Sequence, residues 1–213
     1  MQRLRLKYGR GEKLKFLSHL DLMRLWERAL RRAGLMPAYS EGFSPHPKIS
    51  MAAPLPVGVT GRAEIMDIFL CNNISPELFV KEIAGQLPNG IEIIDTLPVD
   101  LQSPSLQSRL CFAEYSVGIN TDRDNQQVES ALSSMLAREQ IPWHHTRDTG
   151  ERHYNLRVLI DDLWLAGRSG NCCNIGMRLR CGSLGSGRPE QIIRALNLAE
   201  IPVSVERTGL IFA

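Results

Sequence analysis

Residues 17–34 read LSHLDLMRLWERALRRAG and form the clearest element of the chain. Ser18 is a typical helix N-cap, and Asp21 follows three residues later in a variant of the capping box. Gly34 is a natural stop, because glycine readily adopts the left-handed conformation that ends helices. Apolar side chains recur at helical spacing at Leu22, Leu25, Trp26, Ala29, Leu30 and Ala33. The stretch therefore predicts a capped amphipathic helix with one face in a core.

The segments around this helix predict the fold of the first part of the chain. Residues 2–8 alternate between basic and apolar side chains, as a strand does. A second helix is predicted from Ser75, the cap, with Pro76 at its first position. Further strands are predicted at 49–53, 63–71 and 90–97. The order is β-α-β-β-α-β, which is that of a ferredoxin-like unit.

The remainder of the chain repeats this order with an extra strand. The polar, proline-containing segment 98–109 is predicted to be a linker. After it, the expected strands and helices occupy 110–119, 122–140, 142–146, 155–160, 174–181, 189–198 and 203–208. We therefore predict an α+β protein of tandem ferredoxin-like units with antiparallel sheets. The first unit is expected at 1–100 and the second at 108–213.

Charge is unevenly distributed along the chain. Of 213 residues, the first 48 hold 11 Lys+Arg and 4 Asp+Glu, whereas the whole chain has a net charge of only +2. Four arginines of the first helix fall off its apolar stripe: Arg24, Arg28, Arg31 and Arg32. Such a positive face suits phosphate or an acidic partner. The alternative is an ordinary solvated helix face.

Composition bounds the class of protein. A hydrophobic content of 43% supports a proper core. No run of about 18 apolar residues is present, and the N-terminus lacks the apolar core of a signal peptide. The five cysteines include no C-x-x-C pair. We therefore expect a cytoplasmic protein with no membrane association, no metal site and no cofactor.

A proline-rich loop follows the first helix. Residues 39–48 read YSEGFSPHPK, and five prolines fall between residues 37 and 58. Each proline fixes its own φ and restricts the residue before it, so the loop is expected to be stiff. Tyr39 and Phe43 can stack on bases, and Lys48 can neutralise a phosphate. Alternatively, the two rings merely fill a gap between helix and sheet.

With these segments in view, the chain resembles the bacterial radical-SAM-linked domain family, whose function is unknown. The resemblance rests on KFLSHLDLMR (15–24), AYSEGFSPHPKIS (38–50) and MRLR (177–180), and it spans nearly the whole chain. It implies a partner of the radical-SAM type that carries a cobalamin-binding region. The chain itself has no C-x-x-x-C-x-x-C cluster motif, as expected for a stand-alone form. It departs from the family's lysine-rich pattern around 147–153.

Two histidines suggest a catalytic alternative. His19 would lie at the first turn of the helix, where the helix dipole favours its neutral form. With His46 it can form a general base and acid for RNA cleavage without a metal, while Lys48 stabilises the developing phosphorane charge. A zinc site of His19, Asp21 and His46 is a further alternative.

A glycine-rich turn is the second candidate phosphate site. Residues 182–188 precede a predicted helix, and backbone N–H groups at such a turn can hold phosphate. The expected contacts are Ser183, Gly185, Ser186 and Arg188, and Arg178 and Arg180 on one strand face add to them. The turn is neither a Walker motif nor a dinucleotide fingerprint. The alternative is a tight connection between strand and helix.

Three hypotheses follow for the function. The first is an accessory domain that holds RNA, or another phosphate-bearing substrate, for a radical-SAM enzyme. The second is a metal-independent endoribonuclease that uses His19 or His46. The third is an interaction domain whose basic face docks an acidic protein. Tandem ferredoxin-like units with a glycine-rich turn are also similar to repeat-associated CRISPR ribonucleases, by architecture alone.

Overall fold

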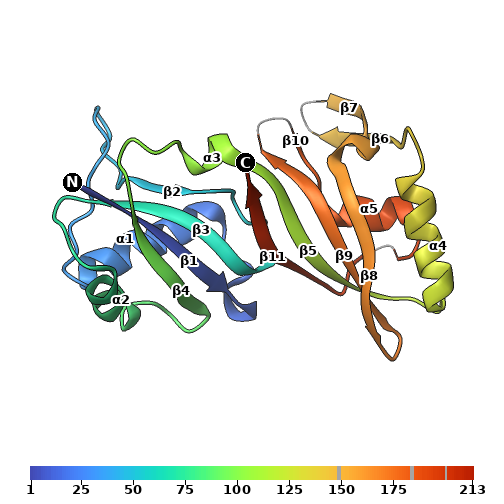
Figure 1. Ribbon diagram of the computed structural model, residues 1–213, viewed down its shortest axis with the longest axis horizontal. Helices are drawn as coiled ribbons and strands as arrows, with labels where there is room; N and C mark the ends of the chain where they lie inside the picture. Colours follow the sequence, from blue (N-terminus) through green and yellow to red (C-terminus); the bar gives the residue numbers. More distant parts are fainter. Residues whose placement is uncertain (148–149, 183–184, 200) are drawn as a thin grey trace. The chain divides into compact units, whose positions relative to one another are not determined.

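The computed structural model describes residues 1–147, 150–182, 185–199 and 201–213 (Figure 1). The chain divides into two compact units, one made of residues 1–110 and 212–213 and the other of residues 111–211. Each unit contains both helices and strands, and the strands pair mostly antiparallel. The α+β class and the antiparallel pairing predicted from the sequence are therefore confirmed.

The sheet of the first unit is centred on β1 (Gln2–Arg10). β1 pairs antiparallel with β3 (Thr60–Leu70) on one side and with β4 (Ile91–Val99) on the other. The short strand β2 (Ile49–Met51) pairs antiparallel with the outer edge of β3. The spatial order within this unit is therefore β2-β3-β1-β4.

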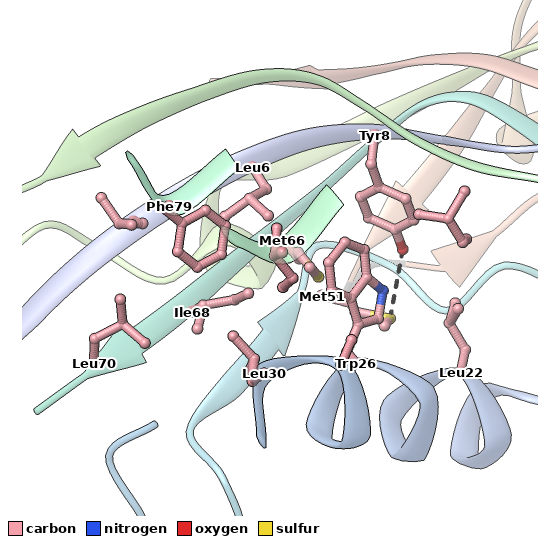
Figure 2. Packing of buried hydrophobic residues seen from close by; sticks show 14 residues of the cluster. Leu6, Tyr8, Leu22, Trp26, Leu30, Met51, Met66, Ile68, Leu70 and Phe79 are labelled. Atoms are coloured by element: carbon pink, nitrogen blue, oxygen red, sulfur yellow. Dashed lines mark hydrogen bonds between the residues drawn. The ribbon is translucent and has the colours of Figure 1, made fainter. Parts of the chain in front are cut away.

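Two helices cover one face of this sheet and enclose the core. α1 (His19–Arg32) is capped by Ser18, and α2 (Pro76–Ala84) follows its cap Ser75 with proline in the first turn, as predicted. A short 3₁₀ turn, η1 (Glu12–Leu14), leads from β1 toward α1. Figure 2 shows Trp26 of α1 edge-on against Tyr8 of β1, with ring centroids 5.3 Å apart. Because such aromatic pairs bury large areas, this contact anchors α1 to the sheet.

The opposite face of the sheet carries a buried ion-pair network. Asp67 of β3 is only 1% exposed and accepts hydrogen bonds from Arg3 at 2.6 Å and from Arg5 at 2.8 Å. Arg3 also donates to the carbonyl oxygens of Ser103, at 2.6 Å, and Pro104, at 3.0 Å. One arginine thus joins the sheet to the segment that follows β4.

That segment is more structured than the predicted linker. It contains a single helical turn, α3 (Leu106–Arg109), which is capped by Ser105. Leu106 is buried, and Gln107 donates hydrogen bonds to the Ser50 hydroxyl at 2.9 Å and to the Met51 carbonyl. The prediction of a plain linker at 98–109 was wrong, because one apolar side chain and one amide attach the segment to the first unit.

The second unit repeats the same spatial order. β9 (Cys172–Gly182) pairs antiparallel with β5 (Leu110–Asn120) and with β8 (Ile160–Ser169). β11 (Ser204–Phe212) lies beside β5, so the order is β8-β9-β5-β11. The helices are α4 (Asn125–Leu136), whose N-cap Asp124 forms a full capping box, and α5 (Pro189–Leu196).

Two departures from the predicted strands lie in the second unit. A separate hairpin, β6 (Pro142–Arg147) and β7 (Gly150–Asn155), precedes the 3₁₀ turn η2 (Leu156–Leu159). The strand predicted at 155–160 is therefore mostly this turn, because the Asn155 side chain accepts from the Arg157 N–H at 3.0 Å and starts it. The long strand β8 was not predicted.

The remaining sequence-derived expectations concern cysteines, metals and membranes. All five cysteines are free, and burial raises the pKa of the Cys173 thiol above its ordinary value. Over the part of the chain that the structure describes, no three His, Cys, Asp or Glu side chains are grouped as metal ligands would be. Among the same residues, no helix combines the length and the apolar character needed to cross a membrane.

Candidate nucleic-acid interface

The first turn of α1 is fixed by its own side chains. The Ser18 hydroxyl accepts from the Asp21 N–H at 3.2 Å and donates to the Asp21 carboxylate at 2.7 Å. Leu22, Trp26 and Leu30 are buried against the sheet. The helix must therefore turn its charged side chains outward, and Arg24, Arg28, Arg31 and Arg32 are all exposed.

Three of these arginines line a groove. Arg24, Arg28 and Arg32 form one wall, and residues 85–88, which follow α2, form the other. The half-buried side chains of Leu17, Leu25 and Leu87 complete the lining, together with Asp21. Its volume is about 560 Å³. We call this feature the arginine groove.

The arginines differ in their partners. Arg24 lies 3.6 Å from the Asp21 carboxylate, and Arg32 donates to the Gln86 side-chain oxygen at 3.2 Å and to its carbonyl at 2.5 Å. Within the described residues, the Arg28 side chain has no hydrogen bond or ion pair. The groove therefore holds three guanidinium groups against one carboxylate, and one of the three is uncommitted.

Arg31 belongs to a different surface. It pairs with Glu27 at 3.2 Å, is 73% exposed and does not line the groove. The prediction grouped it with Arg24 and Arg28 because all three lie off the apolar stripe. Spacing along one helix does not distinguish a groove wall from the neighbouring solvated face, since the second wall comes from another part of the chain.

The proline-rich loop forms a narrow arm, residues 38–48, which extends away from the sheet (Figure 1, light blue). At its base, Ala38 donates to the Phe69 carbonyl at 2.8 Å, and the Phe69 N–H donates to the Lys48 carbonyl at 3.0 Å. Further out, the Ser40 N–H donates to the His46 carbonyl at 2.8 Å, and the His46 N–H donates to the Ser40 hydroxyl at 3.0 Å. Main-chain bonds therefore hold the two sides of the arm together.

The aromatic side chains of the arm face solvent. Phe43, at the tip, is fully exposed, and Tyr39 is 44% exposed. The Phe43 ring fills no gap between helix and sheet, so that alternative is wrong for this ring. His46 is exposed and Lys48 is half-buried, and both belong to the same arm. The arm thus presents two rings, an imidazole and an ammonium group close together in sequence and on one hairpin.

The structure does not bring His19 and His46 together. His19 is close in sequence to Leu17, whose carbonyl binds Arg10, and Arg10 pairs with Gly61 at the start of β3. The base of the arm is instead attached to Phe69, near the end of β3. The eight residue steps from Gly61 to Phe69 span roughly 26 Å of strand. The proposed base–acid pair and the alternative zinc site are therefore not assembled.

In the second unit, the charge of Arg178 is compensated by neighbouring carboxylates. Arg178 lies opposite Glu114 in the β5–β9 ladder and binds its carboxylate at 2.9 Å, with Asp161 at 3.5 Å. The hydrogen bond to Glu114 raises the pKa of the Arg178 guanidinium above its ordinary value. Arg180 lies over the Phe112 ring, with 5.9 Å from its guanidinium carbon to the centroid. These contacts favour a role in the sheet over the predicted phosphate contact.

In its described residues, the glycine-rich turn resembles a tight connection more than a phosphate cradle. Gly185 and Ser186 form β10, which pairs with the end of β9. The Gly187 N–H already donates to the Arg180 carbonyl at 2.9 Å. A Cβ on Gly187 would lie 3.0 Å from Leu179 Cβ, so the missing side chain allows this close approach.

Two other predicted contacts of this turn have different outcomes. Arg188 is exposed at the N-cap of α5 and makes no side-chain capping bond. Ser183 lies outside the described residues. The turn belongs to the second unit and the arginine groove to the first.

Sequence similarity gives the chain a family. Residues 3–189 match the model of a family described as an uncharacterized protein conserved in bacteria (DUF2344). The chain belongs to this family. The description names no reaction and no radical-SAM protein, so that link remains a proposal. No curated protein matches the chain.

Two solved structures are similar to this chain. One is the crystal structure of a Cbf5–Nop10–Gar1 complex, with a TM-score of 0.53 at 10% identity over 98% of this chain and 48% of that one. Another is the archaeal box H/ACA sRNP Nop10–Cbf5 complex, with a TM-score of 0.49 at 9% identity over 98% and 47%. The family member thus spans about half the length of the chains it matches. The first likeness concerns the mixed α+β fold alone.

Proposed function

We propose that this protein is a non-catalytic accessory domain that binds RNA, or another phosphate-bearing substrate, for a radical-SAM protein that carries a cobalamin-binding region. The observation that carries the proposal is the arginine groove. Three guanidinium groups line it against one carboxylate, and Arg28 has no partner among the described residues. Because Arg28 pairs with no carboxylate in the part of the chain that the structure describes, its guanidinium group is available for an anionic ligand.

Guanidinium groups suit phosphate by geometry as well as by charge. Their planar fork of N–H donors matches two phosphate oxygens at once, and they are weakly hydrated. Arg32 is held toward the groove by Gln86, which reduces the side-chain freedom it would lose on binding. The groove is therefore partly preorganised for phosphate.

The arm supplies the second part of the proposed interface. An exposed aromatic side chain on a nucleic-acid-binding protein can stack on a base, which contributes roughly 1–3 kcal/mol per base. Phe43 meets this requirement because it is exposed at the tip of a hairpin stiffened by main-chain bonds. Lys48 and His46 add polar groups beside it.

Two further elements of the proposal concern architecture and partner. The strand orders β2-β3-β1-β4 and β8-β9-β5-β11, with helices in the matching places, support tandem ferredoxin-like units. The stretches at 15–24 and 38–50, which resemble the radical-SAM-linked family, contain Arg24 and the arm. The residues that carry the resemblance are therefore also part of the proposed interface.

The test is binding of labelled transcripts to the purified protein over a range of salt concentrations. Affinity should fall steeply as salt rises, because phosphate contacts release counterions. Phe43→Ala should weaken binding and leave the salt slope unchanged, since it removes stacking alone. No binding to any transcript at low salt would refute the proposal. A protein captured from the host that remains bound after nuclease treatment, with no RNA binding, would favour the acidic-partner hypothesis.

A further inference from the structure

We propose that the arginine groove accepts one strand of single-stranded RNA and excludes duplex RNA. This inference rests on the proposed function, since it specifies the form of RNA that the same groove holds. It is carried by the spacing of the arginines, by the apolar lining between the walls and by the carboxylate at one end.

The spacing of the arginines matches a single strand. Arg24, Arg28 and Arg32 follow one another at intervals of four residues, so each step advances about 6 Å along the helix and turns about 40° around it. Long arginine side chains absorb a turn of this size. Successive phosphates along one extended strand are spaced comparably, so each guanidinium group can meet one phosphate of a consecutive series.

The lining between the walls is apolar. Leu17, Leu25 and Leu87 are half-buried in the groove, and Pro88 lies beside them. These side chains offer a surface to a ribose or to the face of an unstacked base. Only a single strand has free base faces, because a duplex keeps them stacked inside. A duplex would meet the guanidinium groups and leave the leucines uncovered.

The size of the groove points the same way. Its volume of about 560 Å³ lies in the range of pockets that enclose small molecules. Nucleotides of a single strand can enter such a space one after another. A double helix keeps its bases stacked inside and would present only its backbone to this space.

Asp21 sets one end of the site. Its carboxylate lies 3.6 Å from Arg24 at the N-terminal end of the row. A phosphate placed beyond Arg24 would therefore meet a negative charge. Because Asp21 accepts a hydrogen bond from Ser18, its position is fixed by the helix cap. The row then holds one phosphate for each of its three arginines.

The experiment compares one labelled RNA of mixed sequence, free and annealed to its complement, in anisotropy titrations of the full chain at constant salt. The single strand should bind about tenfold more tightly, because it alone uses the apolar lining. Equal or tighter binding of the duplex would overturn this inference and leave the proposed function standing. Failure of both forms to bind at low salt would instead refute the proposed function.

Asp21→Asn tests the end of the site separately. The amide retains a hydrogen-bond acceptor for Ser18 and removes the negative charge. Affinity for the single strand should rise by about threefold to fivefold, because repulsion of a further phosphate disappears. Unchanged affinity, with an unchanged melting temperature, would overturn the assignment of Asp21 as the boundary. Glu27→Gln, on the same helix but outside the groove, raises the net charge by the same amount and is the control.

Discussion

Arg28→Ala separates the groove from the rest of the basic helix. Arg28 is exposed, lines the groove and has no hydrogen bond or ion pair within the described part of the chain. Alanine is the best helix former, so the substitution should leave the stability of α1 unchanged. Any change in RNA affinity then reports the loss of one cation from the groove.

The size of the effect follows from counterion release. Each phosphate neutralised on a single strand contributes about 0.7 to the slope of log K against log salt. Three arginines therefore predict a slope of about −2 for the wild type, and Arg28→Ala should reduce it to about −1.4. At a salt concentration of about 0.1 M, one contact corresponds to roughly fivefold in affinity, or about 1 kcal/mol.

The assay is a set of anisotropy titrations at several salt concentrations for the wild type, Arg28→Ala and Arg31→Ala. The second variant removes the same charge from the same helix, but its side chain pairs with Glu27 outside the groove. It should retain the wild-type slope. The reasoning is refuted if Arg28→Ala lowers the affinity at every salt concentration without changing the slope of log K against log salt. It is equally refuted if both variants lower the slope alike, because net helix charge would then explain binding.

Three further predictions concern stability. Asp67→Ala should lower the free energy of unfolding by about 3–5 kcal/mol in urea denaturation, because Arg3 stays buried without its carboxylate; a loss under about 1 kcal/mol would contradict this. Gly176→Ala should cost about 1–3 kcal/mol and shift tryptophan emission, because the new Cβ would lie 2.0 Å from the Trp164 ring; an unchanged spectrum and stability would count against it. Backbone and side-chain hydrogen bonds at the start of α2 lower the pKa of Glu77, so its charge stabilises the folded state at neutral pH and this contribution fades as pH falls through the folded pKa. The difference in melting temperature between wild type and Glu77→Gln should therefore narrow as the pH falls below the ordinary pKa range of glutamate, and a difference constant with pH would refute the assignment.

Elements defined by local interactions could be predicted from the sequence. The caps Ser18 and Ser75 bond to N–H groups three residues away, and Gly34 ends α1 with a positive φ. The apolar stripe predicts the buried face of α1 directly. Residues three and four apart lie on the same side of a helix, so a periodic apolar pattern marks the side that packs on the sheet. The outward direction of the four arginines follows from the same pattern.

Features that depend on distant parts of the chain could not be predicted. β8 begins with Ile160, Asp161 and Asp162, which do not alternate as a half-buried strand does. The reason lies in β9, where Arg178 pairs with Asp161. Gly176 of β9 likewise leaves room for the Trp164 ring. The sequence of one strand does not indicate which residues of a neighbouring strand will pair with it.

The same limit applies to the candidate site. The wall at 85–88 reads GQLP and carries no signal of its own, yet it converts a helix face into a groove. The separation of His19 from His46 follows from their attachment to opposite ends of β3, which the spacing of 27 residues did not reveal. The prolines of the arm predict a stiff loop, but they carry no signal that Phe43 at its tip faces solvent.

The contacts of Arg3 determine where the first unit can be cut. A fragment that ends at residue 100 would retain Arg3 and Asp67 but lose the Ser103 and Pro104 carbonyls that satisfy the remaining guanidinium N–H groups. It would also lose Gln107, which holds β2 through Ser50 and Met51. A truncated domain intended for binding studies should therefore extend through Arg109. Its sheet then keeps the segment 100–109, whose carbonyl groups and Gln107 side chain bind Arg3 and β2.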